Sequence, residues 1–155
     1  MSEIKFATIG TSKITKTFLS AASNVPGFEL EATYSRNIKN AIEFGTPYNV
    51  TKFYDSLKAL AEDRTIDAVY IASPNAFHCS QAIQMMKAGK HVLCEKSLAS
   101  NKKEAEEMFR TAAENNVILL EAMRPVFDPG MDAVKASLNK LGVIRRATLN
   151  YCQYS

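Results

Sequence analysis

Residues 10–15, Gly-Thr-Ser-Lys-Ile-Thr, follow an apolar run and could bind an anion. They occupy the place of the pattern GxGxxG, which holds the pyrophosphate of dinucleotides, but Ser12 and Thr15 replace its second and third glycines. Gly10 can make the tight turn, and hydroxyl and free N–H groups at a helix N-terminus, with a lysine beside them, form an anion site. The alternative is a plain strand-to-helix turn in which Thr11 or Ser12 caps the helix.

A second group that could bind a ligand, Ser35 and Arg36, follows the next apolar run. In dinucleotide-binding folds, an acid at this point accepts hydrogen bonds from the ribose 2′-hydroxyl, whereas an arginine suits a 2′-phosphate. No acid is present in residues 33–37, and the Arg36 guanidinium can fork onto phosphate and stack on adenine. The charge therefore favours NADP(H), with NAD(H) as the second possibility. The alternative is an Arg36 that only points into solvent.

Two longer motifs follow later apolar runs: residues 72–78, Ala-Ser-Pro-Asn-Ala-Phe-His, and residues 89–96, Gly-Lys-His-Val-Leu-Cys-Glu-Lys. Together with Glu-Ala-Met-Arg at 121–124 and Tyr-Cys-Gln-Tyr at 151–154, they resemble the Gfo/Idh/MocA oxidoreductases over essentially the whole chain. In that family an N-terminal nucleotide-binding domain precedes an α/β substrate domain with a large open sheet. The resemblance implies that this chain carries the first domain and only the beginning of the second.

The resemblance also implies a nicotinamide-cofactor site built from all of these junctions. The residues expected at the pyrophosphate are Gly10, Thr11, Ser12, Lys13 and Ile14. Those expected at the adenosine phosphate end are Ser35 and Arg36, and those expected beside the nicotinamide ribose are Ser73, Pro74, Asn75 and His78. Glu95 and Lys96 match the family's Glu-Lys-Pro motif, whose lysine reaches toward the nicotinamide and the substrate hydroxyl.

Lys96 is therefore the expected catalytic residue, because it can polarise or hydrogen-bond the reacting oxygen while NADP(H) carries the reactive C4. Ser97 stands where the motif has proline, which leaves the backbone less restricted. The family usually completes the proton relay with a substrate-domain His, Tyr or Asp, and this chain offers only Tyr151 and Tyr154. We therefore expect this chain to bind the cofactor, and the substrate domain to be necessary for turnover. The structural alternatives are a buried, satisfied His78 and a merely exposed Lys96.

The resulting prediction is an NADP-preferring dehydrogenase with a small-molecule substrate: a sugar, polyol or related cyclic alcohol or diol. The alternative is a non-catalytic nucleotide sensor or regulatory protein on the same scaffold, for which Ser12, Thr15 and Ser97 would be signs of relaxed catalytic constraint. A Rossmann-like methyltransferase or an interaction domain would leave Glu95 and Lys96 without a role.

The order of predicted strands and helices along the sequence indicates the architecture. Apolar runs bounded by turn residues predict strands at 4–9, 28–34, 68–72, 91–94 and 117–120. Apolar residues at helical spacing predict helices at 75–89, 101–113 and 128–142. Asn101 with Glu104 resembles a capping box, and Asp128 with Pro129 is a typical helix start. The predicted fold class is α/β, a doubly wound parallel sheet of the Rossmann type, buried on both faces.

The C-terminal residues 146–154 alternate between apolar and polar positions, which predicts a strand with one solvated face. We therefore assign residues 1–120 to a dinucleotide-binding domain and residues 121–155 to a connecting helix and the first strand of a largely missing substrate domain. A strand without neighbours is a template for association, so this segment should be poorly packed or pair with another chain. The family's dimers use the substrate-domain sheet, so a homo-oligomer is expected for the full-length protein.

Composition narrows the class of protein further. The chain has 155 residues, 46% hydrophobic and 23% charged, which is typical of one globular domain. No apolar stretch approaches the roughly 18 residues of a membrane span, and the start has no export signal. Three widely spaced cysteines argue against a disulfide framework or a metal site and favour the cytoplasm. The net charge of +3 is spread in small groups among acids, which argues against nucleic-acid binding.

Overall fold

The computed structural model describes residues 3–150 and 152, and the chain divides into two compact units, Met1–Ala122 and Met123–Ser155. The strands of the first unit are β1 (Ile4–Ile9), β2 (Phe28–Tyr34), β3 (Lys52–Tyr54), β4 (Ala68–Ile71), β5 (His91–Cys94) and β6 (Leu119–Glu121). Its α-helices are α1 (Lys13–Ala22), α2 (Ile38–Gly45), α3 (Leu57–Glu62), α4 (His78–Lys87) and α5 (Lys102–Glu114), and its 3-10 helices are η1 (Thr46–Tyr48) and η2 (Asn75–Phe77). The second unit contains η3 (Arg124–Phe127), α6 (Pro129–Ser137) and η4 (Leu138–Leu141).

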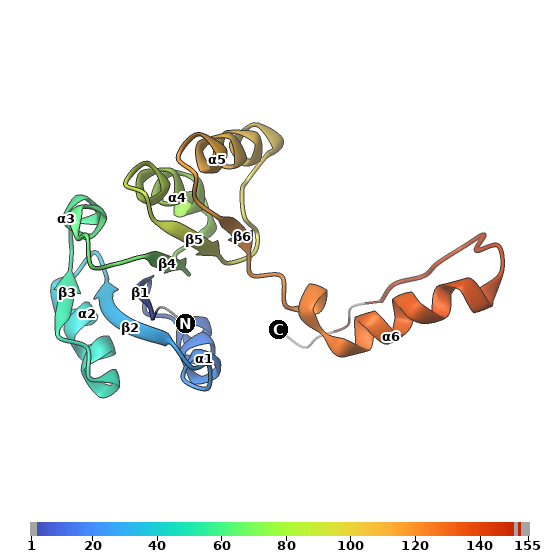
Figure 1. The fold of residues 1–155 in the computed structure, drawn as a ribbon, viewed down its shortest axis with the longest axis horizontal. Helices are drawn as coiled ribbons and strands as arrows, with labels where there is room; N and C mark the ends of the chain where they lie inside the picture. The colour runs from blue at the N-terminus through green and yellow to red at the C-terminus, as the bar shows by residue number, and fades with distance from the viewer. Residues whose placement is uncertain (1–2, 151, 153–155) are drawn as a thin grey trace. The chain divides into compact units, whose positions relative to one another are not determined.

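The strands form one parallel sheet in the order β3-β2-β1-β4-β5-β6. Helices α1 and α2 lie on one face, and α3, α4 and α5 lie on the other (Figure 1). This is the doubly wound arrangement that the sequence predicts, with its switch point between β1 and β4. Because parallel strands end at the same edge, the junctions after β1, β2, β4 and β5 all meet at the carboxyl edge of the sheet.

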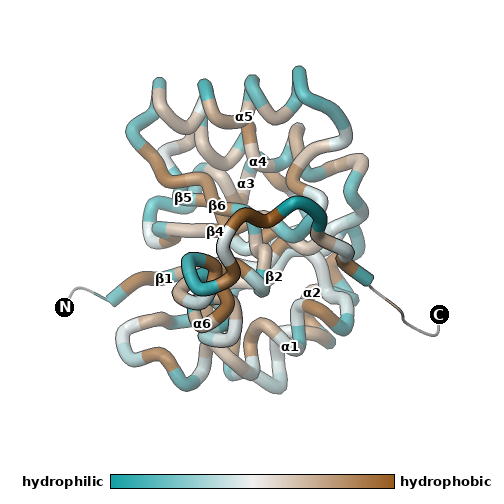
Figure 2. The backbone as a smooth tube through the Cα atoms, turned by 90° about the vertical axis from the view of Figure 1, so that its right-hand side faces the viewer, coloured by the Kyte–Doolittle hydropathy of each residue, from teal (hydrophilic) through white to brown (hydrophobic). Residues whose placement is uncertain are grey.

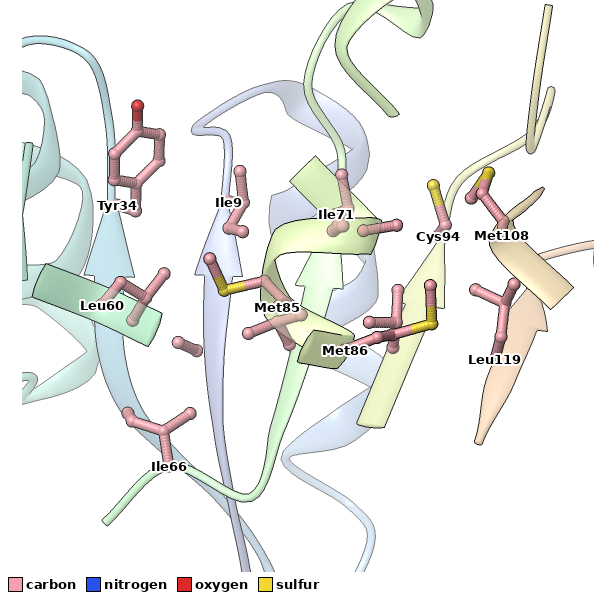
Figure 3. Close-up of a cluster of buried hydrophobic side chains, with 14 of the residues drawn as sticks. Ile9, Tyr34, Leu60, Ile66, Ile71, Met85, Met86, Cys94, Met108 and Leu119 are labelled. Carbon is pink, nitrogen blue, oxygen red and sulfur yellow. The ribbon is translucent and has the colours of Figure 1, made fainter. Parts of the chain in front are cut away.

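The main hydrophobic core lies between the sheet and the helices α3, α4 and α5 (Figure 3). Its strands contribute residues such as Ile9 and Ile71, and its helices contribute Leu60, Met85 and Met86, none of which is exposed to solvent. The flexible methionines suit the irregular space between helix and sheet. Figure 2 shows that hydrophobic residues of the first unit gather on the strands, whereas the outer turns of α5 carry hydrophilic residues.

Local side-chain contacts explain where the helices begin. Asn101 accepts a 3.0 Å hydrogen bond from the Glu104 N–H, and the Glu104 carboxylate accepts one from the Ser100 N–H at 2.9 Å. These two contacts resemble the predicted capping box at the start of α5, except that the Glu104 carboxylate bonds to the N–H of Ser100 and not to that of the N-cap residue Asn101. Ser56 caps α3 through its hydroxyl, and Asn37 caps α2 through its side-chain oxygen.

The sheet differs from the prediction in its bounds, in one additional strand and in the burial of one edge. Strand β4 ends one residue before the predicted 68–72, and β6 lies at 119–121 where 117–120 is predicted. Strand β3 is not among the predicted strands, since it is only three residues long and all three residues become a strand by pairing with 32–34 of β2. The prediction of burial on both faces is wrong for β6, because its Leu120 is 50% exposed, and Ile118, just before the strand, is 58% exposed. The helices α1 and α2 connect the strands β1, β2 and β3. They therefore cover only the β1–β3 half of one face of the sheet and leave β6 uncovered on that face.

In the second unit, Asp128 accepts a 2.7 Å hydrogen bond from the Gly130 N–H, and α6 begins at Pro129 as predicted. The predicted strand is wrong for residues 146–150 and for Cys152, which have neither helix nor strand, while 151 and 153–154 lie outside the described residues. A strand requires backbone hydrogen bonds to a neighbour, and none pairs with this segment in the described part of the chain. Within that part, no helix is long and apolar enough to cross a membrane.

Candidate functional site

A hollow of about 470 Å³ lies at the carboxyl edge of the sheet, over the ends of β1, β2 and β4. The predicted site residues in its lining are Gly10, Thr11, Ser12, Ser35, Arg36, Ser73 and Pro74. The other lining residues are Ile9, Tyr34, Asn40, Leu57, Ala72, Phe77, Ser80 and Gln81. The hollow therefore lies at the switch point of the sheet, where doubly wound folds bind ligands.

Gly10 allows the turn after β1 to approach the end of β4. Its φ of +111° is rare for residues with side chains, and a Cβ there would lie 2.5 Å from the Ala72 carbonyl oxygen. The Gly10 N–H donates to the Tyr34 carbonyl at 3.2 Å, and the Ala72 N–H donates to the Ile9 carbonyl at 2.8 Å. The turn is thus held between β2 and β4, and only glycine fits it without strain.

Helix α1 points an uncapped N-terminus at this turn. Ser12 occupies the N-cap position, but its side chain accepts no hydrogen bond from the first turn of the helix. The Ser12 hydroxyl lies 3.4 Å from the hydroxyl of the buried Thr15 instead. Ser12 therefore stands at the N-cap, as in the alternative interpretation, but makes no side-chain hydrogen bond to the first turn. The first N–H groups of α1 are left for an anion, which the positive end of the helix also attracts.

Arg36 and Phe77 form the side of the hollow beyond β2. The central guanidinium carbon of Arg36 lies 5.5 Å from the centre of the Phe77 ring, within the range of a cation–π interaction. Arg36 is exposed but has a defined position over this ring, so it does more than point into solvent. Next to it, the Ser35 hydroxyl accepts a 3.4 Å hydrogen bond from the Asn37 N–H. A hydroxyl and a guanidinium at this point could bind a phosphate.

The turn after β4 is held by two side chains of α4. The Ser73 hydroxyl donates a 2.6 Å hydrogen bond to the side-chain oxygen of Gln81, and the Ser73 carbonyl lies 2.8 Å from Nε2 of His78. Both Gln81 and His78 are buried. Pro74 and Asn75 continue the turn and are exposed. The helix therefore determines where this wall of the hollow lies.

His78 does not line the hollow itself. It is completely buried, and its Nδ1 lies 2.9 Å from the Ser97 carbonyl. Because its Nε2 contacts the Ser73 carbonyl, the imidazole joins the turn after β4 to the segment after β5. His78 has the buried, hydrogen-bonded environment of the structural alternative, yet both of its partners belong to segments of the predicted site.

Lys96, the expected catalytic residue, follows β5 and is exposed. Its neighbour Glu95 accepts a 2.6 Å hydrogen bond from the Tyr70 hydroxyl. Burial, together with this carboxylate, raises the pKa of Tyr70 well above its ordinary value, so the phenol stays protonated and remains the donor. The peptide bond between Lys96 and Ser97 is cis.

The predicted site residues are not all gathered in one place. Those outside the lining of the hollow are Lys13, Ile14, Asn75, His78, Glu95 and Lys96. Among lining residues that the sequence did not indicate, Phe77 stands inside a recognised motif, whereas Asn40, Leu57 and Gln81 reach the hollow only through the fold. Within the described residues, no three His, Cys, Asp or Glu side chains are grouped to hold a metal ion.

The strand order and the glycine turn between β1 and the N-terminus of α1 are those of a Rossmann-type nucleotide-binding domain. The sequence matches the family described as "Oxidoreductase family, NAD-binding Rossmann fold" over residues 4–123. The chain therefore belongs to the Gfo/Idh/MocA oxidoreductase family, as its motifs suggest.

Relatives of known name match most of the chain. Scyllo-inositol 2-dehydrogenase (NADP(+)) IolU of Bacillus subtilis (strain 168) is 49% identical over 152 residues, which are 98% of this chain and 46% of that protein. Trans-1,2-dihydrobenzene-1,2-diol dehydrogenase of Xenopus tropicalis is 30% identical, over 90% of this chain and 43% of its own. The crystal structure of KijD10, a 3-ketoreductase from Actinomadura kijaniata, in complex with NADP and TDP-benzene is 29% identical with a TM-score of 0.84, over 90% of this chain and 43% of its own. The chain spans somewhat less than half the length of these proteins.

Proposed function

We propose that this chain is the cofactor-binding part of an NADP(H)-dependent dehydrogenase that acts on a sugar, polyol or related cyclic alcohol or diol. The observation that carries the proposal is the hollow between the uncapped N-terminus of α1 and the guanidinium of Arg36. The relatives' names support it: one refers to NADP(+) and scyllo-inositol, another to a dihydrodiol, and a similar crystal structure holds NADP.

The residues around the hollow fit this cofactor. The pyrophosphate would lie against the turn at Gly10, which only glycine lets approach the backbone of Ala72 so closely, and against the free N–H groups that begin α1. The 2′-phosphate would bind Ser35 and Arg36, and a charge-assisted hydrogen bond of this kind is worth roughly 1.5–3 kcal/mol. The nicotinamide end would lie toward Ser73 and Lys96. NADP(H) is therefore favoured over NAD(H), which lacks the phosphate.

When bound, the cofactor supplies hydride transfer at the nicotinamide C4. The chain's own part is to orient the substrate oxygen and to stabilise the charge that develops on it. In reduction the Lys96 ammonium group would donate a hydrogen bond, and then a proton, to this oxygen; in oxidation the neutral Lys96 amine would accept the proton from the hydroxyl. Glu95 holds the backbone next to Lys96 through its contact with Tyr70.

The remaining functions belong to the complete protein. Because the relatives are about twice as long as this chain, we infer that residues 121–155 begin a second α/β domain. That domain would supply the substrate pocket and the second group of the proton relay, and the full-length protein would form a homo-oligomer. The three unpaired cysteines suit the reducing environment of the cytoplasm.

A calorimetric titration of the 155-residue chain with NADPH and NADH tests the proposal. We expect NADPH to bind at least about tenfold more tightly, since one phosphate contact exceeds 1.4 kcal/mol. Arg36→Ala should remove this preference, whereas Arg36→Lys should keep part of it, because lysine retains the charge without the fork. Equal affinities of the unaltered chain would contradict the NADP(H) preference, and binding of neither cofactor would contradict the proposed function. NADP(H)-dependent turnover by the complete gene product distinguishes a dehydrogenase from a nucleotide sensor.

A further inference from the structure

The segment 95–98 carries the expected catalytic lysine, Lys96. Its neighbours on both sides, Glu95 and Ser97, are each contacted by a side chain from another element. Tyr70 of β4 donates a 2.6 Å hydrogen bond to the Glu95 carboxylate. Nδ1 of His78, the first residue of α4, lies 2.9 Å from the Ser97 carbonyl. The contacts therefore flank the lysine on either side, and they come from a neighbouring strand and from the helix that packs on β5.

Glu121 holds the same segment from the other neighbouring strand. Its carboxylate accepts a 2.9 Å hydrogen bond from the Leu98 N–H. Glu121 is the last residue of β6 and pairs in register with Cys94, the last residue of β5, so its carboxylate lies where the segment leaves the sheet. A hydrogen bond to an ionised acceptor is stronger than one between neutral groups.

His78 also connects this segment to the wall of the hollow. Its Nε2 lies 2.8 Å from the carbonyl of Ser73, which lines the hollow. Both partners are carbonyl oxygens, which only accept hydrogen bonds, and a neutral imidazole carries one N–H. The ring therefore donates to one of the two carbonyls and lies in contact with the other. The ring is completely buried, so no solvent competes for these contacts. One buried side chain thus lies between the turn after β4 and the segment after β5 and contacts both.

We propose that His78 and Glu121 are positioning residues that hold these two walls at a fixed separation for the nicotinamide end of NADP(H) and so aim Lys96 at the reacting oxygen. This inference rests on the proposed function. Lys96 is exposed, so its direction depends on the backbone that carries it. Neither positioning residue needs to touch the cofactor, because each acts through a backbone group of the walls.

The test compares two ligands on the 155-residue chain: NADPH, and 2′,5′-ADP, which has the adenosine and the 2′-phosphate but no nicotinamide. His78→Leu and Glu121→Leu should each weaken NADPH binding about tenfold, or 1.4 kcal/mol, and change 2′,5′-ADP binding less than about twofold. Arg36→Ala serves as the matched control with the opposite pattern, because it should weaken both ligands. If His78→Leu does not fold, Glu121→Leu still tests the inference, because Glu121 holds the segment 95–98 from strand β6.

Conservative variants separate positioning from general packing. His78→Gln keeps an N–H donor and Glu121→Gln keeps an acceptor oxygen, so both should recover most of the NADPH affinity. Equal weakening of the two ligands by both leucine variants, or unchanged NADPH binding in Glu121→Leu, would overturn the inference and leave the proposed function standing. Failure of the unaltered chain to bind NADPH would overturn the proposed function, and the inference with it.

Discussion

The Arg36 guanidinium lies over the Phe77 ring, with 5.5 Å between its central carbon and the ring centre. The two residues come from separate junctions, since Arg36 follows β2 and Phe77 lies in η2, yet both line the hollow. The ring restricts a long side chain that would otherwise have many rotamers. Arg36 is therefore partly ordered before a phosphate arrives, which lowers the entropy lost on binding.

Phe77→Leu is expected to weaken NADPH binding about two- to fivefold, because an exposed cation–π contact is worth about 0.5–1 kcal/mol. NADH binding should change less, since NADH has no 2′-phosphate for Arg36 to bind. Calorimetry with both cofactors measures the difference, and Phe109→Leu, at another exposed phenylalanine outside the hollow, is the control. Equal losses for NADPH and NADH would show that Phe77 does not act through Arg36.

Lys96→Ala is expected to affect turnover and not folding, because this exposed side chain adds no core packing. In the complete gene product, kcat should fall about 10²-fold or more, the usual loss of a donor to a developing oxyanion. The melting temperature and the NADPH affinity should stay nearly unchanged. The exposed Lys103, on α5, supplies the matched alanine control. Wild-type rate constants in Lys96→Ala would contradict the catalytic role.

Gly10→Ala is expected to destabilise the chain more than Gly89→Ala does. Both glycines have positive φ values, +111° and +79°, but a Cβ at Gly10 would meet the Ala72 carbonyl oxygen at 2.5 Å, whereas one at Gly89 would meet nothing within 4 Å. Gly89→Ala should cost only the conformational term of about 1–2 kcal/mol, and Gly10→Ala should cost about 1 kcal/mol more. Urea unfolding measures both, and equal midpoints would refute the close approach of the two turns.

Asp63 makes the stability depend on pH in the acid range. Its carboxylate accepts hydrogen bonds from the Tyr54 hydroxyl at 2.7 Å, the Thr65 N–H at 2.9 Å and the Lys52 ammonium at 3.3 Å. Burial opposes the charged form, but these bonds outweigh it and hold the pKa of Asp63 well below its ordinary value of 3.8. A lowered pKa favours folding above the ordinary value, and this contribution is lost as the pH falls toward the folded-state pKa.

Asp63→Asn should therefore reduce the free energy of unfolding near neutral pH and flatten its decline below about pH 4. Urea unfolding at a series of pH values gives both quantities. The exposed Asp55, changed to asparagine, is the control and should leave the acid decline in place. An unchanged pH profile in Asp63→Asn would mean that other groups control acid unfolding.

Several elements could be predicted because their signals are local. The runs at Ile4–Ile9, Phe28–Tyr34 and His91–Cys94 have the predicted bounds, and α5 begins at its predicted cap. Strand length, helical spacing and capping residues are all properties of neighbouring residues, so they can be found without a fold. Strand β3 has no such signal, because its three residues become a strand only by pairing beside β2. Residues 146–150 show the reverse: they alternate like a strand but pair with nothing among the described residues.

The chemistry divides in the same way. The sequence by itself indicated the glycine turn after β1, the arginine after β2 and the lysine after β5 as candidate site residues, because each belongs to a short motif at a strand end. Only the tertiary structure brought the Ser97 carbonyl to His78, and the Glu121 carboxylate to Leu98. These partners stand far apart in the sequence and become neighbours through the parallel order of β4, β5 and β6. Hydrogen bonds act over about 3 Å, so the folded path of the chain, and no local pattern, decides which groups can form them.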